Sequence, residues 1–263
     1  MALEAVSSAF LILLHQASVG GLFPLAAVLE YFNRRGFFKV VAVTCLSLGG
    51  ITLGLELASG KSPGLGQAAF LLFLALFVGS LWLKDDWKSL LLYRLTLVAG
   101  MMDLVSSTFS FRSGPFLTGA SFLLLLGFFT SALLLGSTMA GMLLGHYYLV
   151  EPGLSIKPLR RLVALYLASA LLQGFLVLAS LAFFFPGEGW PSSKAVLSDH
   201  PYALIGRVGM GVFGPLALGV LVWETLNIPH TQAATGLLYV AIVFVVVGEL
   251  LGRYLLAVSL VPL

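Results

Sequence analysis

The stretch that decides the fold runs from residue 117 to residue 147 and reads LTGASFLLLLGFFTSALLLGSTMAGMLLGHY. It contains no Asp, Glu, Lys or Arg, and it is longer than the ~20 apolar residues that a helix needs to cross a bilayer. Lipid offers no partners for backbone N–H and C=O groups, so a spanning segment must satisfy them internally, as a helix does. We therefore expect a transmembrane helix here.

Apolar segments of the same kind fill most of the remaining chain. Short breaks rich in Gly, Pro or charged residues separate them, and only the loop at about residues 186–202 is long. With the first included, the segments comprise residues 5–31, 39–58, 66–83, 89–108, 117–147, 160–185, 203–226 and 234–260. The sequence therefore predicts an all-α integral membrane protein, a bundle of about eight transmembrane helices that forms a single transmembrane domain over residues 1–263.

The composition supports a membrane protein. Hydrophobic residues make up 59% of the chain, charged residues only 10%, and the mean hydropathy is +1.04, whereas soluble domains carry about 25% charged residues. The first segment begins almost at Met1 without a preceding basic region, so we expect a retained helix rather than a signal peptide. These features predict a multi-pass protein of the cell inner (cytoplasmic) membrane, in contact with lipid and not with nucleic acid.

Basic residues predict the orientation, because cytoplasmic loops carry an excess of Lys and Arg. The first, third and fifth loops hold Arg34, Arg35, Lys39, Lys84, Lys88, Lys157, Arg160 and Arg161. The opposite side holds Lys61, Arg112, Lys194 and, at the start of the seventh segment, Arg207. We therefore expect both termini on the outer side, with Arg207 at the outer surface.

Ionisable residues inside the predicted spans are the main functional signal, since each costs a few kcal/mol at the centre of a bilayer. At ~1.5 Å per residue along a helix, most of them fall at a similar depth in the outer half. The candidates for a site at this depth are His15, its neighbour Gln16, Glu56, Asp103, Arg207, Glu249 and Arg253. The inner half holds Glu30, Arg94, His146 and Glu224, where snorkelling relieves the cost.

Asp103 has no basic residue one turn away on its own helix, so it needs a partner from another helix, a water-filled cavity or a proton. Glu249 and Arg253 share one helix face. They either neutralise each other, with Arg207 closing a structural network, or organise a site. A second candidate patch, His146 with Tyr147, is either an interfacial anchor or a substrate contact.

The cysteine and histidine content limits the redox centres. A single cysteine, Cys45, leaves no internal disulfide, Cys-ligated iron–sulfur cluster or Cys-based zinc site, and we predict no metal site. A b-type haem needs two histidines at similar depth. Only His146 and His230 meet that condition, at the inner edge, so one b-type haem stays an alternative.

Small residues recur where helices are expected to pack closely. They are Gly50 and Gly54, Gly141 and Gly145, and the run Gly206, Gly209, Gly211 and Gly214. Residues 206–215 are also the only stretch that resembles a broken helix.

Three short motifs carry a family resemblance. They are Gln16 followed by Gly20 and Gly21, then Gly127-Phe128-Phe129-Thr130, and finally Gly248-Glu249 with Arg253 and Tyr254. With eight spans and both termini outside, the chain resembles the membrane-anchor subunits of the dimethyl sulfoxide reductase type, the group that includes the polysulfide-reductase-like anchors. The family has a quinol-site histidine near the outer end of its second helix, where this sequence has Glu56.

The resemblance implies a quinone-binding subunit of a respiratory electron-transfer complex that has no turnover alone. Such anchors carry no redox cofactor. They bind a quinone or quinol (menaquinone or ubiquinone) near the outer leaflet and exchange electrons with an attached iron–sulfur or cytochrome-bearing subunit. His15 and Asp103 would contact the carbonyls and move protons, with Glu56 and Gln16 beside them. Glu249 and Arg253 would organise the site or the docking surface, and Arg207 is a further candidate for the site.

Two other functions fit the same residues. Buried Asp103, Glu56 and Glu249 suit a proton-coupled transporter, although such proteins usually show broken helices in both halves. The polar residues also suit a purely structural membrane subunit without a quinone site.

Overall fold

A computed structural model describes residues 2–31, 35–83, 85–110, 119–151, 155–185, 192–228 and 231–263. Several residues used above lie outside this part, namely Arg34, Lys84, Arg112, His230 and residues 186–191 of the long loop. The elements are α1 (Ala2–Gly20), η1 (Phe23–Tyr31), α2 (Arg35–Ala58), α3 (Leu65–Ser80), α4 (Asp86–Ser110), α5 (Gly119–Val150), α6 (Lys157–Phe184), α7 (Ser193–Asp199), α8 (Pro201–Val208), η2 (Gly209–Phe213), α9 (Gly214–Asn227) and α10 (Thr231–Ser259). The described residues contain no β-strand.

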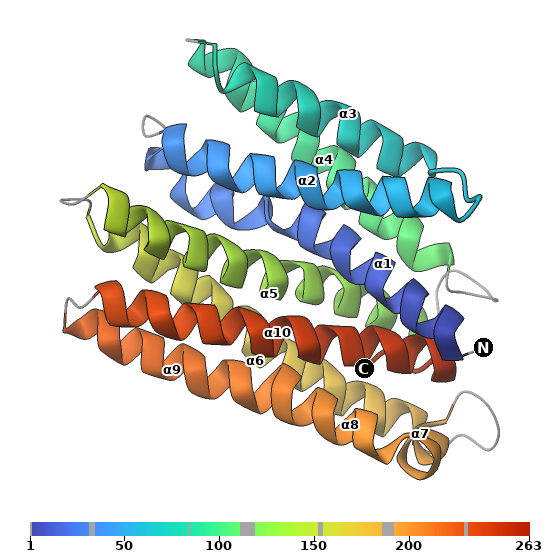
Figure 1. The fold of residues 1–263 in the computed structure, drawn as a ribbon. Coiled ribbons are helices and arrows are strands. Elements are labelled where there is room, and N and C mark those ends of the chain that lie inside the picture. Colours follow the sequence, from blue (N-terminus) through green and yellow to red (C-terminus); the bar gives the residue numbers. More distant parts are fainter. Residues whose placement is uncertain are drawn as a thin grey trace.

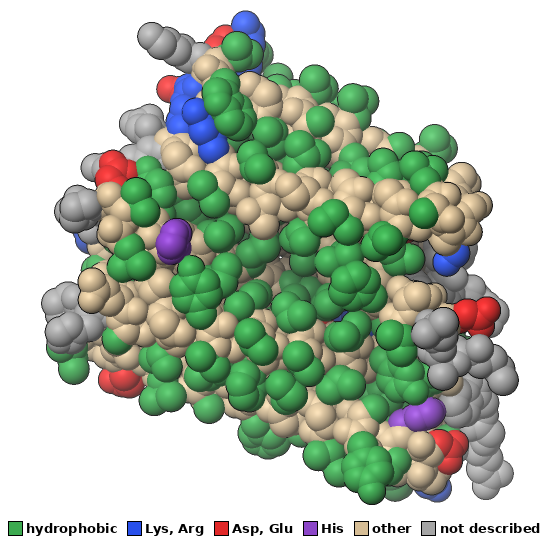
Figure 2. Space-filling view, in the orientation of Figure 1, with side chains coloured by type: hydrophobic (Ala, Val, Ile, Leu, Met, Phe, Trp, Pro, Cys, Tyr) green, Lys and Arg blue, Asp and Glu red, His purple; other side chains and the backbone are tan. Residues whose placement is uncertain are grey.

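The long helices lie side by side in one bundle, with the two chain ends at the same end of it (Figure 1). Among the described residues, 7 helical segments are long and apolar enough to cross a membrane, and α3 is a shorter apolar helix of 16 residues. Hydrophobic side chains cover the middle of the face in Figure 2, while most charged side chains lie toward its two ends. The predicted multi-pass all-α membrane bundle is confirmed. Which end faces outward stays a prediction.

Helix α5 is the central element and packs against α1, α6 and α10. Its crossing with α1 is a backbone contact: a Cβ on Gly136 would lie 1.9 Å from the carbonyl oxygen of Gly20. The close packing predicted at Gly50 and Gly54 is wrong, because a Cβ at either position would meet no atom within 4 Å. Both glycines lie on parts of α2 that do not touch a neighbouring helix.

Two spans are irregular. In the seventh, η2 is a π-helical turn just before Pro215, which has no N–H to donate to the preceding turn. The sequence predicted an irregularity there. The first span also changes, since α1 ends at Gly20 and continues as the 3₁₀ helix η1, in which Val28 has non-helical angles. The sequence did not predict this second interruption.

Several boundaries differ from the prediction by a few residues. Helix α3 ends at Ser80 rather than at residue 83. Part of the predicted loop at 186–202 is helical, because Ser192 caps α7 by accepting a hydrogen bond from the backbone N–H of Lys194. This short helix lies at the same end of the bundle as the two chain ends (Figure 1).

Candidate functional site

A cleft of about 550 Å³ opens at the end of the bundle that carries the chain termini. Helix α1, the connection from α2 to α3, and the last turns of α4 form its walls. Its polar lining includes His15, Glu56, Lys61, Gln67, Asp103 and Ser106. Three of the residues singled out from the sequence therefore share one cavity, although they come from three different spans.

His15 and Asp103 lie next to each other in the lining of this cleft. The Nε2 atom of His15 lies 3.0 Å from the Oδ2 atom of Asp103, and the two residues are only 8% and 2% exposed. The two atoms are not aligned as a hydrogen bond, and neither has another hydrogen-bond partner among the described residues. Asp103 therefore has the partner from another helix that the sequence required, and both groups keep bonding capacity for a ligand.

Glu56 lies at the same cleft and is held from α3. The amide nitrogen of Gln67 donates a hydrogen bond of 2.6 Å to Glu56 Oε2. Helix α3 approaches α4 closely here, because a Cβ on Gly66 would lie 3.0 Å from Asp103 Oδ1. The cleft thus combines an acid–histidine pair with a second carboxyl group that is partly exposed.

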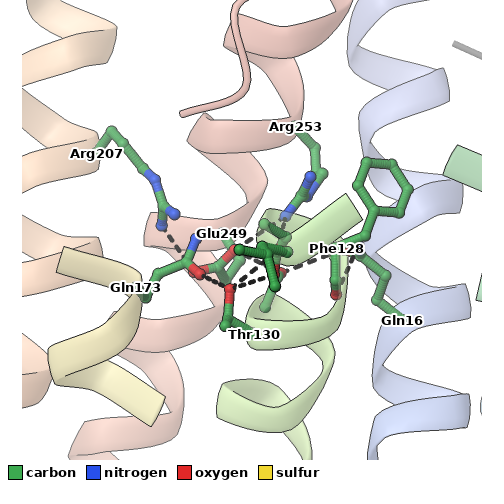
Figure 3. Close-up of polar contacts among 10 residues, drawn as sticks. Gln16, Phe128, Thr130, Gln173, Arg207, Glu249 and Arg253 are labelled. Atoms are coloured by element: carbon green, nitrogen blue, oxygen red, sulfur yellow. Dashed lines mark hydrogen bonds and ion pairs between the residues drawn. The ribbon is translucent and has the colours of Figure 1, made fainter. Parts of the chain in front are cut away.

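A separate cluster of charges lies inside the bundle (Figure 3). Arg207 and Glu249 are both 0% exposed, and their Nη1 and Oε1 atoms are 2.7 Å apart. On the other carboxylate oxygen, Ser131 donates a hydrogen bond of 2.5 Å, and Arg253 Nη2 lies 3.6 Å away. This cluster therefore holds one carboxylate between two guanidinium groups.

Helices α1 and α5 supply the rest of the cluster. Gln16 accepts a hydrogen bond of 3.3 Å from Ser131 and donates one of 3.5 Å to the carbonyl oxygen of Phe128. The guanidinium carbon of Arg253 lies 4.6 Å from the centre of the Phe128 ring, a cation–π contact. Beside it, Thr130 donates to the side-chain oxygen of Gln173 (Figure 3). With Gln173 on α6, Arg207 on α8 and Glu249 on α10, the cluster ties five helices together.

Glycines make room for Arg207. A Cβ on Gly252 would lie 2.8 Å from its Nε atom, and one on Gly211 would lie 2.5 Å from its Nη1 atom. A Cβ on Gly248 would lie 2.1 Å from the Cα of Gly211, so η2 and α10 touch through their backbones. The predicted close packing is confirmed at Gly211, whereas a Cβ on Gly209 would meet nothing within 4 Å.

The structure therefore divides the predicted site into two. His15, Glu56 and Asp103 lie at the cleft, while Gln16, Arg207, Glu249 and Arg253 lie in the buried cluster. The expectation that Arg207 sits at the outer surface is wrong, because its pairing with Glu249 draws it fully inside. The alternative, in which Arg207 closes a network with Glu249 and Arg253, is what the structure contains.

The second candidate patch is also divided. Tyr147 lines a cavity of about 270 Å³ at the other end of the bundle, together with Tyr31 and Tyr148. His146 does not line it. Its ring Nδ1 atom lies 3.3 Å from the hydroxyl of Tyr239 on α10.

Sequence reasoning missed Lys61, Gln67, Ser131 and Gln173. Gln67 had a usable signal, because it is an amide inside a predicted span that faces Glu56 across one short loop. Ser131 had none, since serine is common in membrane helices and its role depends on which helix it meets.

Comparison of the chain with protein-family models, with curated proteins and with solved structures finds no match.

Proposed function

We propose that this multi-pass membrane protein is the quinone-binding anchor subunit of a respiratory electron-transfer complex in the cytoplasmic membrane. In this proposal the quinone head group binds in the cleft, and electrons pass to an attached iron–sulfur or haem subunit. The observation that carries the proposal is the His15–Asp103 pair, almost fully buried yet lining a cleft of about 550 Å³. Ligand sites usually enclose roughly 300–1,000 Å³ and present a few polar groups in an apolar wall.

The chemistry of quinol oxidation suits these groups. Each of the two O–H bonds of the quinol breaks, two protons leave, and two electrons pass to the partner's redox centre. His15 accepts the first proton as general base, while Asp103, whose Oδ2 atom lies 3.0 Å from Nε2 of His15, orients its ring. Glu56, partly exposed at the same cleft, carries protons onward to water. Reduction of a quinone runs the same steps in reverse.

The redox partner follows from the cysteine content. With Cys45 as the only cysteine, and that residue buried, the chain itself cannot ligate an iron–sulfur cluster through thiolates. The proposal therefore needs a second subunit that docks at the end of the bundle where the cleft opens.

The test is to purify the chain with its attached subunits from native membranes and to measure bound quinone and quinol-driven reduction of the partner. We expect stoichiometric quinone in the wild type. His15→Ala and Asp103→Asn should lose it and slow electron transfer by ~10²–10⁴-fold, the usual contribution of a general base. His146→Ala, at the far end of the bundle, is the matched control and should behave as the wild type.

Two results would reject this function. One is a preparation with neither quinone nor a redox subunit. The other is quinone that survives His15→Ala but is lost in His146→Ala, which would move the site to the end of the bundle that carries His146.

A second function has one observation in its favour. The first span breaks after Gly20, and the seventh passes through a π-helical turn at Gly209–Phe213, so irregular helices occur in both halves, as in many transporters. Proton-coupled transport predicts proton flux into vesicles that contain the isolated chain, and loss of that flux in Asp103→Asn. The quinone-anchor proposal predicts no flux.

A further inference from the structure

Arg94 is a cation on the lipid-facing side of α4. It is exposed, and its neighbours one turn away on the same face, Leu91 and Val98, are 42% and 56% exposed. Arg94 follows Asp86, the first residue of α4, by two turns, which places its Cα ~12 Å inside the span. An arginine at this depth needs an anion or water within reach of its side chain.

No part of the described chain supplies that anion. Two described arginines on this end of the bundle have carboxylate partners: Arg35 pairs with Asp86, and Arg161 with Glu30. Arg94 forms no ion pair or hydrogen bond with any described residue. Its guanidinium group is therefore directed to the surroundings of the protein.

The helix geometry directs Arg94 toward the membrane interface. Side chains on an α-helix lean toward its N-terminus, which for α4 is the end at Asp86. Trp87 lies two turns closer to that end on the same face and is 70% exposed. Nearby, Lys39 lies 4.7 Å over the ring of Trp82, itself 60% exposed. Exposed tryptophans of this kind mark the level of the lipid headgroups.

We propose that Arg94 and Trp87 form a binding site for the phosphate of an anionic membrane phospholipid. The guanidinium fork matches two phosphate oxygens, and the indole N–H of Trp87 is a further donor. The acyl chains lie along the apolar stripe of Leu91, Val98 and Met101. A phosphate is the anion that a bilayer itself supplies at the headgroup level, toward which the Arg94 side chain leans, and the many basic residues at this end favour an anionic lipid. This site is independent of the quinone cleft, which lies at the opposite end of α4.

The test compares thermal unfolding of the detergent-purified protein with and without added phosphatidylglycerol, and with phosphatidylcholine as the neutral lipid. The wild type should show an upward shift in Tm with phosphatidylglycerol and a smaller one with phosphatidylcholine. Arg94→Leu should lose the difference between the two lipids, with an affinity for phosphatidylglycerol reduced ~5-fold for one lost Arg–phosphate contact. Without lipid, Arg94→Leu should be as stable as the wild type or more so, because an unneutralised charge has gone, so misfolding does not confuse the result.

Lys39→Leu is the matched control, since it removes a cation at the same end of the bundle that already has an aromatic partner. It should keep the full response to phosphatidylglycerol. The proposal is overturned if Arg94→Leu responds like the wild type, or if Lys39→Leu loses the response equally, which would mean general attraction to anionic lipid. It is also overturned if Arg94→Leu instead releases a co-purifying polypeptide, because Arg94 would then pair with a partner's carboxylate.

Discussion

The cleft and the buried cluster have similar ionisable residues at similar depth, but they differ in what surrounds them. In the cluster, Glu249 and Arg207 are 0% exposed and have protein partners on three helices, α5, α8 and α10. In the cleft, His15 and Asp103 pair with one another and line a cavity of about 550 Å³. A charged residue inside a membrane span thus has a structural role where other protein groups enclose it. It is a candidate functional residue where it lines a cavity.

Part of the motifs that carry the family resemblance lies in the cluster. Gln16 donates to the carbonyl oxygen of Phe128, and Arg253 contacts Gly127, Phe128 and Glu249. Gly20, Gly21 and Tyr254 lie outside it. The departure from the family pattern, Glu56, lies in the cleft. The resemblance therefore concerns how α1, α5 and α10 assemble, and it leaves the ligand of the cleft to be tested directly.

The largest expected effect is on the cluster. Glu249→Gln leaves two buried guanidinium groups without a carboxylate, and breaking a buried ion pair in this way costs about 3–5 kcal/mol. We expect a strong loss of folded protein, measured as yield and thermal stability in detergent.

A double variant separates charge from packing. If the loss arises from uncompensated cations, Glu249→Gln with Arg207→Gln should recover part of the stability lost by Glu249→Gln alone, as a double-mutant cycle measures. Additive losses would show that the pair in Figure 3 is not energetically coupled.

The next largest effect is expected at the close crossing of α1, which lines the cleft, and α5, which carries part of the cluster. Gly136→Ala places a methyl group against the carbonyl of Gly20 and should cost about 1–3 kcal/mol as α1 and α5 separate. Gly50→Ala is the control, because its methyl group meets nothing within 4 Å, and it should be neutral or slightly stabilising. Equal losses in both variants would mean that the α1–α5 crossing is not a close contact.

The fold was predictable because hydropathy is a one-dimensional property of the chain. Runs such as residues 117–147 must be helices whatever their neighbours are. The break in the first span was not predictable, because Gly20 ends α1 where α5 needs its backbone to approach, which depends on a contact with Gly136. The sequence also predicted helix α3, but the helix ends at Ser80, before the end of the apolar segment at residue 83.

The candidate residues were predictable, but their division into two sets was not. Depth along a helix follows from residue number, whereas the direction of a side chain around the bundle depends on how the helices pack. His15 and Gln16 are neighbours in sequence and ~100° apart around α1. One therefore faces α4 and the cleft, and the other faces α5 and the cluster.

These two neighbours give the sharpest comparison of the two regions. Gln16→Ala removes two long hydrogen bonds inside the protein and should cost about 1 kcal/mol of stability while leaving ligand binding in the cleft nearly unchanged. His15→Ala should lose the bound ligand, and it should also cost stability because it leaves the buried Asp103 carboxyl group without its partner. Thermal unfolding and ligand content, measured on both variants, test this, and loss of the ligand in Gln16→Ala as well would join the two regions into one unit.

The smallest expected effect is at the mouth of the cleft. Glu56→Gln keeps the size of the side chain and can still accept the hydrogen bond from Gln67, so its stability should stay within about 0.5 kcal/mol of the wild type. It removes the carboxyl group that passes protons to water, so turnover should fall while the amount of bound ligand stays the same. Measuring both separates proton transfer from binding. Turnover equal to the wild type would mean that protons leave the His15–Asp103 pair by another route.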